Sequence, residues 1–411
     1  MATWLLPPGD LTPDQIRAVE MAPDQNRVVF GVAGSGKTQV LIHRADYLAR
    51  NYNVPRDKYR VFVFTNVIKE YIKSGIQFLG LPDYTVTTFD QWCNFVFKNE
   101  ISTNYPRING SIDFGKIRLS VLNHLKRNPS SQKTLEFALV DEGQDLTPEA
   151  FEILKLAARH VTIFADRMQQ IFSEGATEEQ ILEKVGIRYE NATLLGAYRN
   201  SPYIAQIAAY FIPDEIRQRQ YLSQISTRQM TNERPLCFVA ENHDDEMDRM
   251  AEIIRERQSM NERVGIIVPK VKQVHGFANY MQDRDVHIEK AIPPKYPGNT
   301  GNYDFGNLVP KIATYHSAKG LTFDSVILPK LIEKDFDDIS KQQSVLRMRL
   351  LFVGIARATK WVYLSTIRGR ELQEFSIIKE AAKNKHLVIH DGNVTARRTK
   401  SRGDDFDDMP F

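Results

Sequence analysis

The sequence predicts an α/β protein with two domains, each built around a parallel sheet, and three observations lead to this prediction. The chain has 411 residues, 42% of them apolar, which is enough for two or three hydrophobic cores. Short apolar runs of strand length alternate with helical stretches in both halves of the chain. The first such strand continues directly into a glycine-rich loop and a helix, and ligands bind at the carboxyl ends of parallel strands.

Composition excludes several classes of protein. A net charge of +3, from 54 basic and 51 acidic residues, gives no global argument for a polyanionic partner. The cysteines, Cys93 and Cys237, lie far apart with no Cys or His at metal-ligand spacing, which favours a reducing compartment and disfavours a zinc site. The opening segment lacks a basic region before Pro7, and no later segment approaches the length of a membrane span. We therefore expect a cytoplasmic protein without a membrane partner.

The elements of the first half follow in order. A short helix is expected over residues 11–20, where Thr12 is the N-cap and Pro13 the first helical residue. A helix also follows the glycine-rich loop, and another follows the second strand. Strands are expected at residues 27–30, 60–65, 135–142 and 160–166.

The second half repeats the alternation. A segment rich in Pro, Gly and Asn, residues 291–307, is expected to be a surface loop. Residues 393–411 have a basic cluster followed by an acidic one, a composition that cannot build a core, and predict a disordered C-terminal tail. Strands are expected at residues 235–240, 263–269, 311–316, 324–329 and 361–366.

The glycine-rich loop carries the most specific motif. Residues 31–38, GVAGSGKT, match GxxxxGK[ST], in which backbone N–H groups surround phosphates. Lys37 would reach the β- and γ-phosphates and Thr38 would bind Mg²⁺. An ordinary glycine turn that caps a helix is the alternative, but the strand before the loop and the helix after it favour nucleotide binding.

Charged residues elsewhere fit phosphoryl transfer. Asp141 and Glu142 end an apolar strand, where the first could hold Mg²⁺ and the second could take a proton from the attacking water. By itself such a pair is usually a solvated turn, and the phosphate motif upstream reverses this preference. Arg199 and Arg357 are candidates to stabilise the γ-phosphate as it leaves, and the alternative for each is a surface position.

Nine short segments together resemble the UvrD/Rep-like superfamily 1 DNA helicases. They are LTPDQ, GVAGSGKT, VFTN, TTF, VDEGQD, DRMQQIF, AYRN, YHSAKGLTFD and LLFVGIARA, and they occur in the family's order over residues 11 to about 366. The resemblance implies two RecA-like P-loop NTPase domains that use ATP and Mg²⁺ and act on single-stranded DNA. The implied domains are residues 1–195, with a short insert at about 95–133, and residues 196–392, with loop 291–307 in place of a large second insert.

The resemblance also implies roles for individual residues. Gln15 would read the adenine, Tyr198 would stack on it, Gln169 would sense the γ-phosphate, and Arg199 and Arg357 would be the arginine fingers. The remaining nucleotide-binding positions would be Gly34, Ser35, Gly36, Lys37, Thr38 and Gln39. Residues lining the DNA path would be Phe64, Thr65, Asn66, Thr88, Phe89, His316, Ser317 and Lys319. Rings there stack on bases and short polar groups meet phosphates, although Phe64 and Phe89 could equally belong to the core.

Departures from the family pattern qualify these roles. Gln39 stands where the family often has an arginine against the adenine, and Thr322 stands where a glutamate meets the ribose. A base-stacking tryptophan is replaced within residues 173–176. Because both inserts are reduced, we expect a motor that translocates on single strands, 3′→5′ by resemblance, and relies on a partner for efficient unwinding. The alternative is a nucleic-acid-dependent ATPase switch or adaptor that does not unwind.

The last residues resemble the acidic tip of bacterial single-stranded DNA-binding protein. Residues 404–411 read DDFDDMPF, so Asp407, Asp408, Pro410 and Phe411 would bind proteins that recognise that tip. An aromatic ring fills an apolar pocket while aspartates meet Arg or Lys. The alternative is an acidic tail that only improves solubility.

Overall fold

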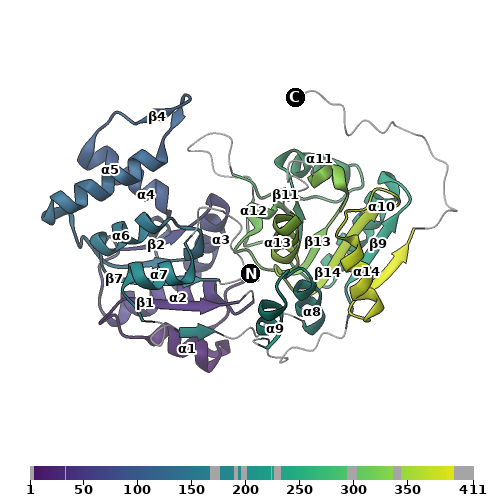
Figure 1. The fold of residues 1–411 in the computed structure, drawn as a ribbon, viewed down its shortest axis with the longest axis horizontal. Helices are drawn as coiled ribbons and strands as arrows, with labels where there is room; N and C mark the ends of the chain where they lie inside the picture. Colours follow the sequence, from purple (N-terminus) through teal and green to yellow (C-terminus); the bar gives the residue numbers. More distant parts are fainter. Residues whose placement is uncertain are drawn as a thin grey trace.

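The chain forms two α/β units, each built on one parallel sheet, in the computed structural model (Figure 1). The first unit runs from purple to teal in Figure 1, and the second runs from teal-green to yellow. The structure describes residues 4–32, 34–166, 176–188, 193–195, 201–223, 225, 233–293, 303–336 and 344–392. The predicted α/β fold class with parallel sheets is confirmed.

The sheet of the first unit has the strand order β3-β2-β6-β7-β1-β8, and every neighbouring pair is parallel. Its inner strands are continuous apolar runs because helices cover both faces of the sheet. The strands are β1 (Arg27–Gly31), β2 (Tyr59–Val63), β3 (Val86–Thr88), β6 (Leu135–Val140), β7 (Ala158–Ala165) and β8 (Thr193–Leu195).

Several helices of the first unit begin at a residue whose side chain caps the first turn. Thr12 accepts a hydrogen bond from the Gln15 amide and starts the first helix, and Asp113 accepts one from the Lys116 amide and starts the fifth. The insert between β3 and β6 holds a small antiparallel hairpin, β4 (Arg107–Ile108) and β5 (Ser111–Ile112). The helices are α1 (Pro13–Glu20), α2 (Lys37–Asn51), α3 (Asn66–Ile76), α4 (Phe89–Val96), α5 (Phe114–Arg127), α6 (Pro148–Ala157) and α7 (Glu178–Val185).

The sheet of the second unit has the order β11-β12-β10-β13-β14-β9-β15, again with only parallel pairs. Its strands are β9 (Leu236–Ala240), β10 (Val264–Val268), β11 (Glu289–Lys290), β12 (Lys311–Thr314), β13 (Phe323–Leu328), β14 (Ala358–Ile367) and β15 (Val388–Asp391). Its helices are α8 (Pro202–Tyr210), α9 (Glu215–Ser223), α10 (His243–Ser259), α11 (Val271–Gln282), α12 (Tyr315–Ala318), α13 (Ser344–Ile355) and α14 (Phe375–Lys383).

Sequence periodicity located the long strands and missed the short ones. Six strands, β3, β4, β5, β8, β11 and β15, were not predicted, because two to four residues are too few to show an alternating pattern. The strand expected at 311–316 ends at Thr314, whose hydroxyl accepts a hydrogen bond from the Ser317 amide and starts α12. The strand expected at 60–65 likewise ends before Thr65, which is the N-cap of α3.

One hydrophobic core is shared by the two units. Ile68 and Tyr71 of α3 belong to the same buried cluster as Phe305 and Leu321 of the second unit. The described ends of the loop expected at residues 291–307 form no helix or strand, but two of their residues are not at the surface. Ala291 and Phe305 are buried, because the Phe305 ring packs edge-on against Tyr71 with ring centroids 5.2 Å apart.

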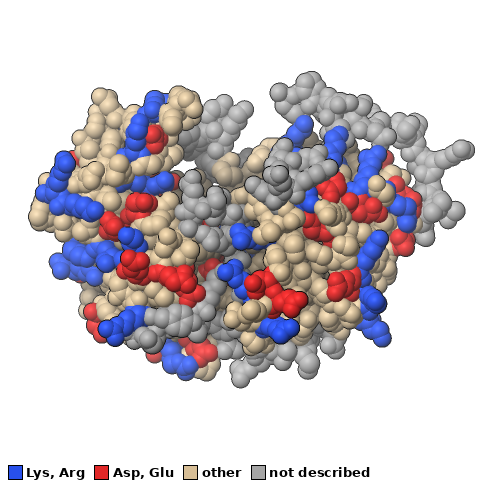
Figure 2. Space-filling view, in the orientation of Figure 1, with Lys and Arg blue, Asp and Glu red and all other residues tan. Residues whose placement is uncertain are grey.

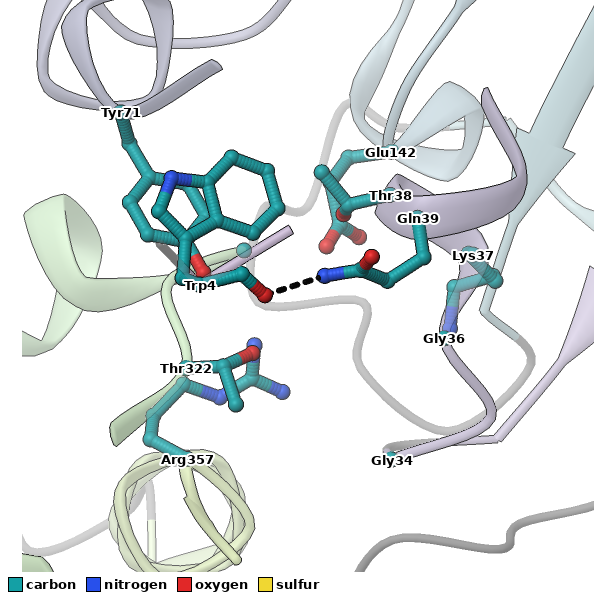
Figure 3. Close-up of a pocket in the computed structure, with 11 residues that line it drawn as sticks. Trp4, Gly34, Gly36, Lys37, Thr38, Gln39, Tyr71, Glu142, Thr322 and Arg357 are labelled. Carbon is teal, nitrogen blue, oxygen red and sulfur yellow. Dashed lines mark hydrogen bonds between the residues drawn. The ribbon is translucent and has the colours of Figure 1, made fainter. Parts of the chain in front are cut away.

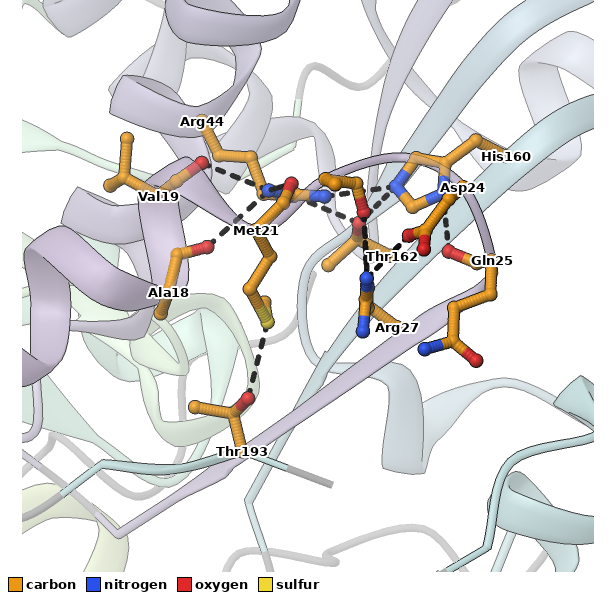
Figure 4. Close-up of polar contacts among 11 residues, drawn as sticks. Ala18, Val19, Met21, Asp24, Gln25, Arg27, Arg44, His160, Thr162 and Thr193 are labelled. Atoms are coloured by element: carbon orange, nitrogen blue, oxygen red, sulfur yellow. Dashed lines mark hydrogen bonds and ion pairs between the residues drawn. The ribbon is translucent and has the colours of Figure 1, made fainter. Parts of the chain in front are cut away.

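A buried arginine ties α1 and α2 to the first sheet (Figure 4). Arg44 of α2 donates to the carbonyl of Met21 just past α1, to the hydroxyl of Thr162 and to Nε2 of His160. The His160 Nδ1 atom lies 2.9 Å from the carbonyl oxygen of Gln25, so it carries the ring proton and Nε2 accepts. Burial lowers the pKa of Arg44 to about 10 and that of His160 to about 3. The network fixes the helix that follows the phosphate motif.

The surface agrees with the balanced composition. Figure 2 shows Lys and Arg interspersed with Asp and Glu over the visible face of both units. Among the described residues, no helix is both long enough and apolar enough to span a bilayer. Cys93 and Cys237 are both buried free thiols, and burial raises the pKa of each well above its usual value. No cluster of three or more His, Cys, Asp and Glu side chains suited to a metal occurs in the part of the chain that the structure describes.

Candidate active site

The phosphate motif connects β1 to α2 and has the backbone geometry that anion binding needs. Gly34 and Gly36 adopt left-handed conformations, with φ of 78° and 80°, which a residue with a side chain rarely adopts. Gly36 is also the N-cap of α2, so the unpaired amides of the first helical turn open at the loop. Together with the helix dipole, these amides provide a site for phosphate groups.

The Lys37 ammonium group is held over this loop. Its Nζ donates to the carbonyl oxygens of Gly31 (3.0 Å) and Val32 (3.2 Å) and to Oδ2 of Asp166 (3.0 Å). Asp166 directly follows β7 and is 2% exposed. Its role was missed from the sequence, although its position at the carboxyl end of a strand was a usable signal. Asp166 neutralises Lys37 in this arrangement.

Two acidic residues follow β6 and face the loop. The Thr38 hydroxyl donates to Oδ2 of Asp141 at 3.1 Å. Glu142 has a φ of 51°, a left-handed conformation that costs a non-glycine residue about 1–3 kcal/mol. Gln144 holds the strained residue in place by donating from Nε2 to the Glu142 carboxylate at 2.5 Å. Strain retained beside a phosphate loop is typical of functional sites.

The two carboxyl groups titrate differently. Burial, reinforced by the charge of Glu142, raises the pKa of Asp141 to about 7. Burial alone would also raise the pKa of Glu142, but Lys319, Lys37 and Arg357 hold it below its usual value. Glu142 therefore stays ionised and can accept a proton, as a general base must.

The oxygen atoms of Thr38 and Asp141 suit a magnesium ion. Mg²⁺ prefers hard oxygen ligands and is usually held by one or two carboxylates together with water and phosphate oxygens. The hydroxyl of Thr38 and the carboxylate of Asp141 already converge at 3.1 Å beside the phosphate loop. This donor set fits the ion predicted from the sequence.

The second unit completes the pocket (Figure 3). Gly320, Thr322 and Arg357 line it together with Lys37 and Glu142 of the first unit. Arg357 is 6% exposed, and its Nε donates to the carbonyl oxygen of Val353 at 3.1 Å, which orients the guanidinium group. A charged group fixed opposite the phosphate loop can stabilise negative charge that develops there.

A buried ion pair joins the two units beside this pocket. Lys319 Nζ lies 2.7 Å from Oδ1 of Asp145, and both side chains are almost fully buried. Gly320, next in the chain, has a φ of 81°, and a Cβ there would lie 2.8 Å from Ile68 of α3. Glycine therefore permits the close approach of the two units at this point.

The glutamines expected near the base have other partners. Gln15 accepts from the Thr12 amide through Oε1 and donates from Nε2 to the carbonyl oxygen of Ser35. Gln39 donates to the carbonyl oxygen of Trp4 and accepts from the Leu6 amide, both at 2.8 Å. Trp4 and Tyr71 line the pocket and were missed from the sequence, because nothing local links either residue to the phosphate motif.

The predicted DNA-path residues of the first unit gather at the carboxyl ends of β2 and β3. Phe64 and Thr88 line a hollow that also includes Arg118 and Asp145. Phe89 lines the same hollow but is only 4% exposed, since its ring packs with Phe62 and Trp92. Of the two phenylalanines, Phe89 is thus a core residue and Phe64 is half-buried.

The neighbouring polar residues have helix-terminal roles. Thr65 and Thr88 are the N-caps of α3 and α4, and Asn66 accepts a hydrogen bond from Gln91 at 2.9 Å. Three helices, α3, α4 and α12, therefore begin near this edge of the molecule, with His316 and Ser317 in the last of them. His316 is exposed and Ser317 is buried.

Lys319, predicted to line the DNA path, lies in a buried ion pair. It is 1% exposed and paired with Asp145 rather than open to a DNA phosphate. Other predicted residues, Gln169, Tyr198, Arg199, Asp407, Asp408, Pro410 and Phe411, lie outside the described residues.

The chain is similar in sequence or in fold to known proteins, among them the following two. A "probable DNA helicase" of Mycoplasma pneumoniae is 21% identical over 308 residues, which are 69% of this chain and 54% of that protein. The chain thus spans about half the length of this curated relative. A solved structure of the C-terminal domain of a possible DNA helicase from Lactobacillus plantarum WCFS1 covers 48% of this chain and 100% of its own, with 14% identity and a TM-score of 0.34.

Two family models match the chain directly. The UvrD/REP helicase N-terminal domain matches residues 11–106, which include the phosphate loop. The UvrD-like helicase C-terminal domain matches residues 306–369, which include Lys319 and Arg357. Each match lies in one of the two units that meet at the pocket. The chain is therefore similar to UvrD-like helicases in one segment of each unit.

Proposed function

We propose that the protein is an ATP-dependent DNA helicase that moves along single-stranded DNA and hydrolyses ATP between its two α/β units. The observation that carries this proposal is one pocket lined by Lys37, Thr38 and Glu142 from the first unit and by Arg357 from the second. Phosphates bound at the loop would lie between a carboxylate that accepts protons and a guanidinium group that stabilises negative charge.

The polar and charged residues at the phosphate loop and opposite it have separate roles in this hydrolysis. Lys37 and the first-turn amides of α2 bind the phosphates. Thr38 and Asp141 would hold magnesium, which would supply positive charge to the bound phosphates. Glu142 accepts the proton of the attacking water, and Arg357 stabilises the charge on the departing γ-phosphate. On sequence grounds we assign Gln169 and Arg199 to the γ-phosphate and Tyr198 to the adenine.

Strand movement would follow from closure and reopening of the two units around ATP. The ion pair between Lys319 and Asp145 supports this coupling because it joins the two units. Gly320, next to Lys319 in the chain, lines the ATP pocket, and Asp145 lines the hollow that includes Phe64. We propose that DNA crosses this edge past Phe64 and His316, in the 3′→5′ direction that the resemblance implies. Residues 1–195 and 196–392 are the proposed domains.

Strand displacement measured beside ATP hydrolysis tests the proposal. The substrates are partial duplexes with a 3′ or a 5′ single-stranded tail, and Lys37→Ala is the inactive control. We expect single strands to stimulate ATP turnover and displacement to occur from the 3′ tail alone. Turnover without displacement or directional movement would instead identify an ATPase switch, and rapid unwinding of long duplexes by the protein alone would refute the expected dependence on a partner.

We also propose that residues 404–411 bind proteins that recognise the tip of single-stranded DNA-binding protein. Four aspartates and two phenylalanines in eight residues support this, since such a segment suits an apolar pocket rimmed by cations. Deletion of Phe411 should abolish that binding and leave DNA-stimulated ATP turnover intact. Unchanged capture of those proteins would refute it. The buried, widely spaced cysteines support the cytoplasm as the proposed compartment.

A further inference from the structure

A short segment before α1 is fastened across the start of α2. Gln39 holds it from both sides, donating to the Trp4 carbonyl oxygen and accepting from the Leu6 amide. His43, one turn further along α2, lies 2.9 Å from the carbonyl oxygen of Leu6 through Nε2. Gln39 is 1% exposed, so these two bonds occupy its amide in a buried setting. The segment is thereby fixed at the mouth of the pocket.

The side chain of Trp4 is fixed as well. Its indole stacks on Tyr71 with ring centroids 3.9 Å apart and an interplanar angle of 17°, and Nε1 donates to the Ser74 hydroxyl at 2.9 Å. A Cβ at Gly75 would lie 2.6 Å from the Trp4 ring, so glycine permits this packing on α3. Tyr71 in turn contacts Phe305 of the second unit. Both units therefore support the position of Trp4.

Trp4 lies across the pocket from the phosphate loop (Figure 3). A nucleotide whose phosphates bind at Gly34, Gly36 and Lys37 must extend its nucleoside away from that loop. Gln15, the residue expected to read the base, does not line the pocket, and its amide is bonded to Thr12 and Ser35. The Gln39 amide is bonded to the Trp4 segment. Among the described residues, Trp4 and Tyr71 are the aromatic side chains that line the pocket, and Trp4 is the one whose backbone Gln39 holds.

We propose that Trp4 contacts the nucleoside of the bound nucleotide and that Gln39 is the positioning residue that holds Trp4 there. The inference rests on the proposed function in that ATP occupies this pocket. Truncation of an aromatic side chain that stacks on a base weakens binding by about 5- to 150-fold. Only a small part of the indole is open, 6% of the residue's surface, so we expect an effect at the low end, about tenfold in affinity.

The test compares ATP with inorganic tripolyphosphate, which has the phosphates and lacks the nucleoside. Binding of each, with Mg²⁺, is measured calorimetrically for wild type, Trp4→Ala, Trp4→Phe and Gln39→Glu. We expect Trp4→Ala to weaken ATP binding about tenfold and tripolyphosphate binding less than about twofold. Trp4→Phe should restore most of the ATP affinity. Gln39→Glu should also lower the affinity for ATP relative to tripolyphosphate, because a carboxylate cannot donate a hydrogen bond to the Trp4 carbonyl oxygen.

A second measurement does not depend on truncating Trp4. The chain has three tryptophans, so Trp92→Phe with Trp361→Phe leaves Trp4 as the fluorophore. Saturating ATP should change its emission, and saturating tripolyphosphate should change it much less. Equal responses to both ligands, or an unchanged ratio of affinities in Trp4→Ala, would overturn the proposal.

The outcomes also separate this proposal from the proposed function. If wild type binds neither ligand, both proposals fail. If ATP binds and is hydrolysed but the affinity ratio is the same in wild type and Trp4→Ala, only the role of Trp4 fails. If Trp4→Ala lowers the ratio and Gln39→Glu does not, Trp4 keeps its role and Gln39 loses the positioning role.

Discussion

Lys319 of the second unit and Asp145 of the first form an ion pair of 2.7 Å whose side chains are 1% and 0% exposed. The two residues are 174 positions apart in the chain. Removing one partner of such a pair leaves an uncompensated buried charge, which is far more costly than losing an exposed pair. The free energy of unfolding therefore depends on this contact between the two units.

Lys319→Met is expected to lower the free energy of unfolding by about 3–5 kcal/mol, because Asp145 remains buried without its partner. The double variant Lys319→Met with Asp145→Asn should regain most of this loss. Chemical denaturation followed by circular dichroism measures both. Lys126→Met, which breaks the exposed pair with Glu152, is the matched control and should change stability by less than about 1 kcal/mol. Equal effects of the two lysine substitutions would contradict the prediction.

Glu142→Gln should slow ATP turnover by about 10²–10⁴-fold, because the amide cannot accept the proton of the attacking water. ATP should still bind, since the phosphate loop and Lys37 are untouched. Steady-state kinetics and nucleotide binding measure the two effects separately. Glu149→Gln, on the exposed face of α6, is the control. Turnover within threefold of wild type would remove Glu142 from the proposed role.

Arg357→Ala tests the contribution of the second unit to hydrolysis. Arginines that stabilise the departing phosphate are worth about 10³–10⁵-fold in kcat, and Arg357 is held toward the pocket by Val353. We expect a loss in that range with ATP affinity changed far less. The exposed Arg370→Ala should leave both parameters unchanged. A rise in KM with normal kcat would show that Arg357 only binds ATP.

Phe64→Ala tests the hollow at the end of β2. If the half-buried ring stacks on a base, its loss should weaken single-strand binding by about 1–3 kcal/mol, or roughly 5- to 150-fold. Fluorescence anisotropy with a labelled oligonucleotide measures this. Phe78→Ala is the control, since Phe78 is 51% exposed and lies outside the hollow. Equal DNA affinity of the two variants would exclude Phe64 from the DNA path.

His160 should make the protein less stable in mild acid. Burial lowers its pKa to about 3, while in the unfolded chain it is about 6.5. Between these values the unfolded state binds the extra proton, so stability is complete above about pH 6.5 and falls as the pH decreases toward 3. At pH 5 the loss from this group is about 2 kcal/mol.

Denaturation at pH 7 and pH 5 measures this dependence. His160→Gln should remove the loss of stability that His160 causes between pH 7 and pH 5. His287→Gln, at an exposed position, should leave that loss unchanged. An identical pH dependence in wild type and His160→Gln would contradict the assignment.

Local sequence determined the parts of the site that lie within one strand–loop–helix segment. The phosphate loop, the helix that starts at Thr12, and the carboxylates after β6 were all predictable, because glycine conformations, caps and apolar strand patterns act over a few residues. Two α/β units followed from the same patterns. The short strands were not predictable, since their pairing depends on the rest of the sheet. The burial of Ala291 and Phe305 in loop 291–307 was not predictable either, since it depends on packing against distant residues.

Only the tertiary structure decided which side chains meet. The amides of Gln15 and Gln39 were free to face a base as far as sequence could tell, and packing gave them to Ser35 and to the Trp4 segment. Phe89 entered the core and Lys319 a buried pair. The physical reason is that a polar or aromatic side chain takes the partner that packing brings within reach. Such partners, 20 residues apart for Gln15 and Ser35 and 174 apart for Lys319 and Asp145, leave no periodic trace in the sequence.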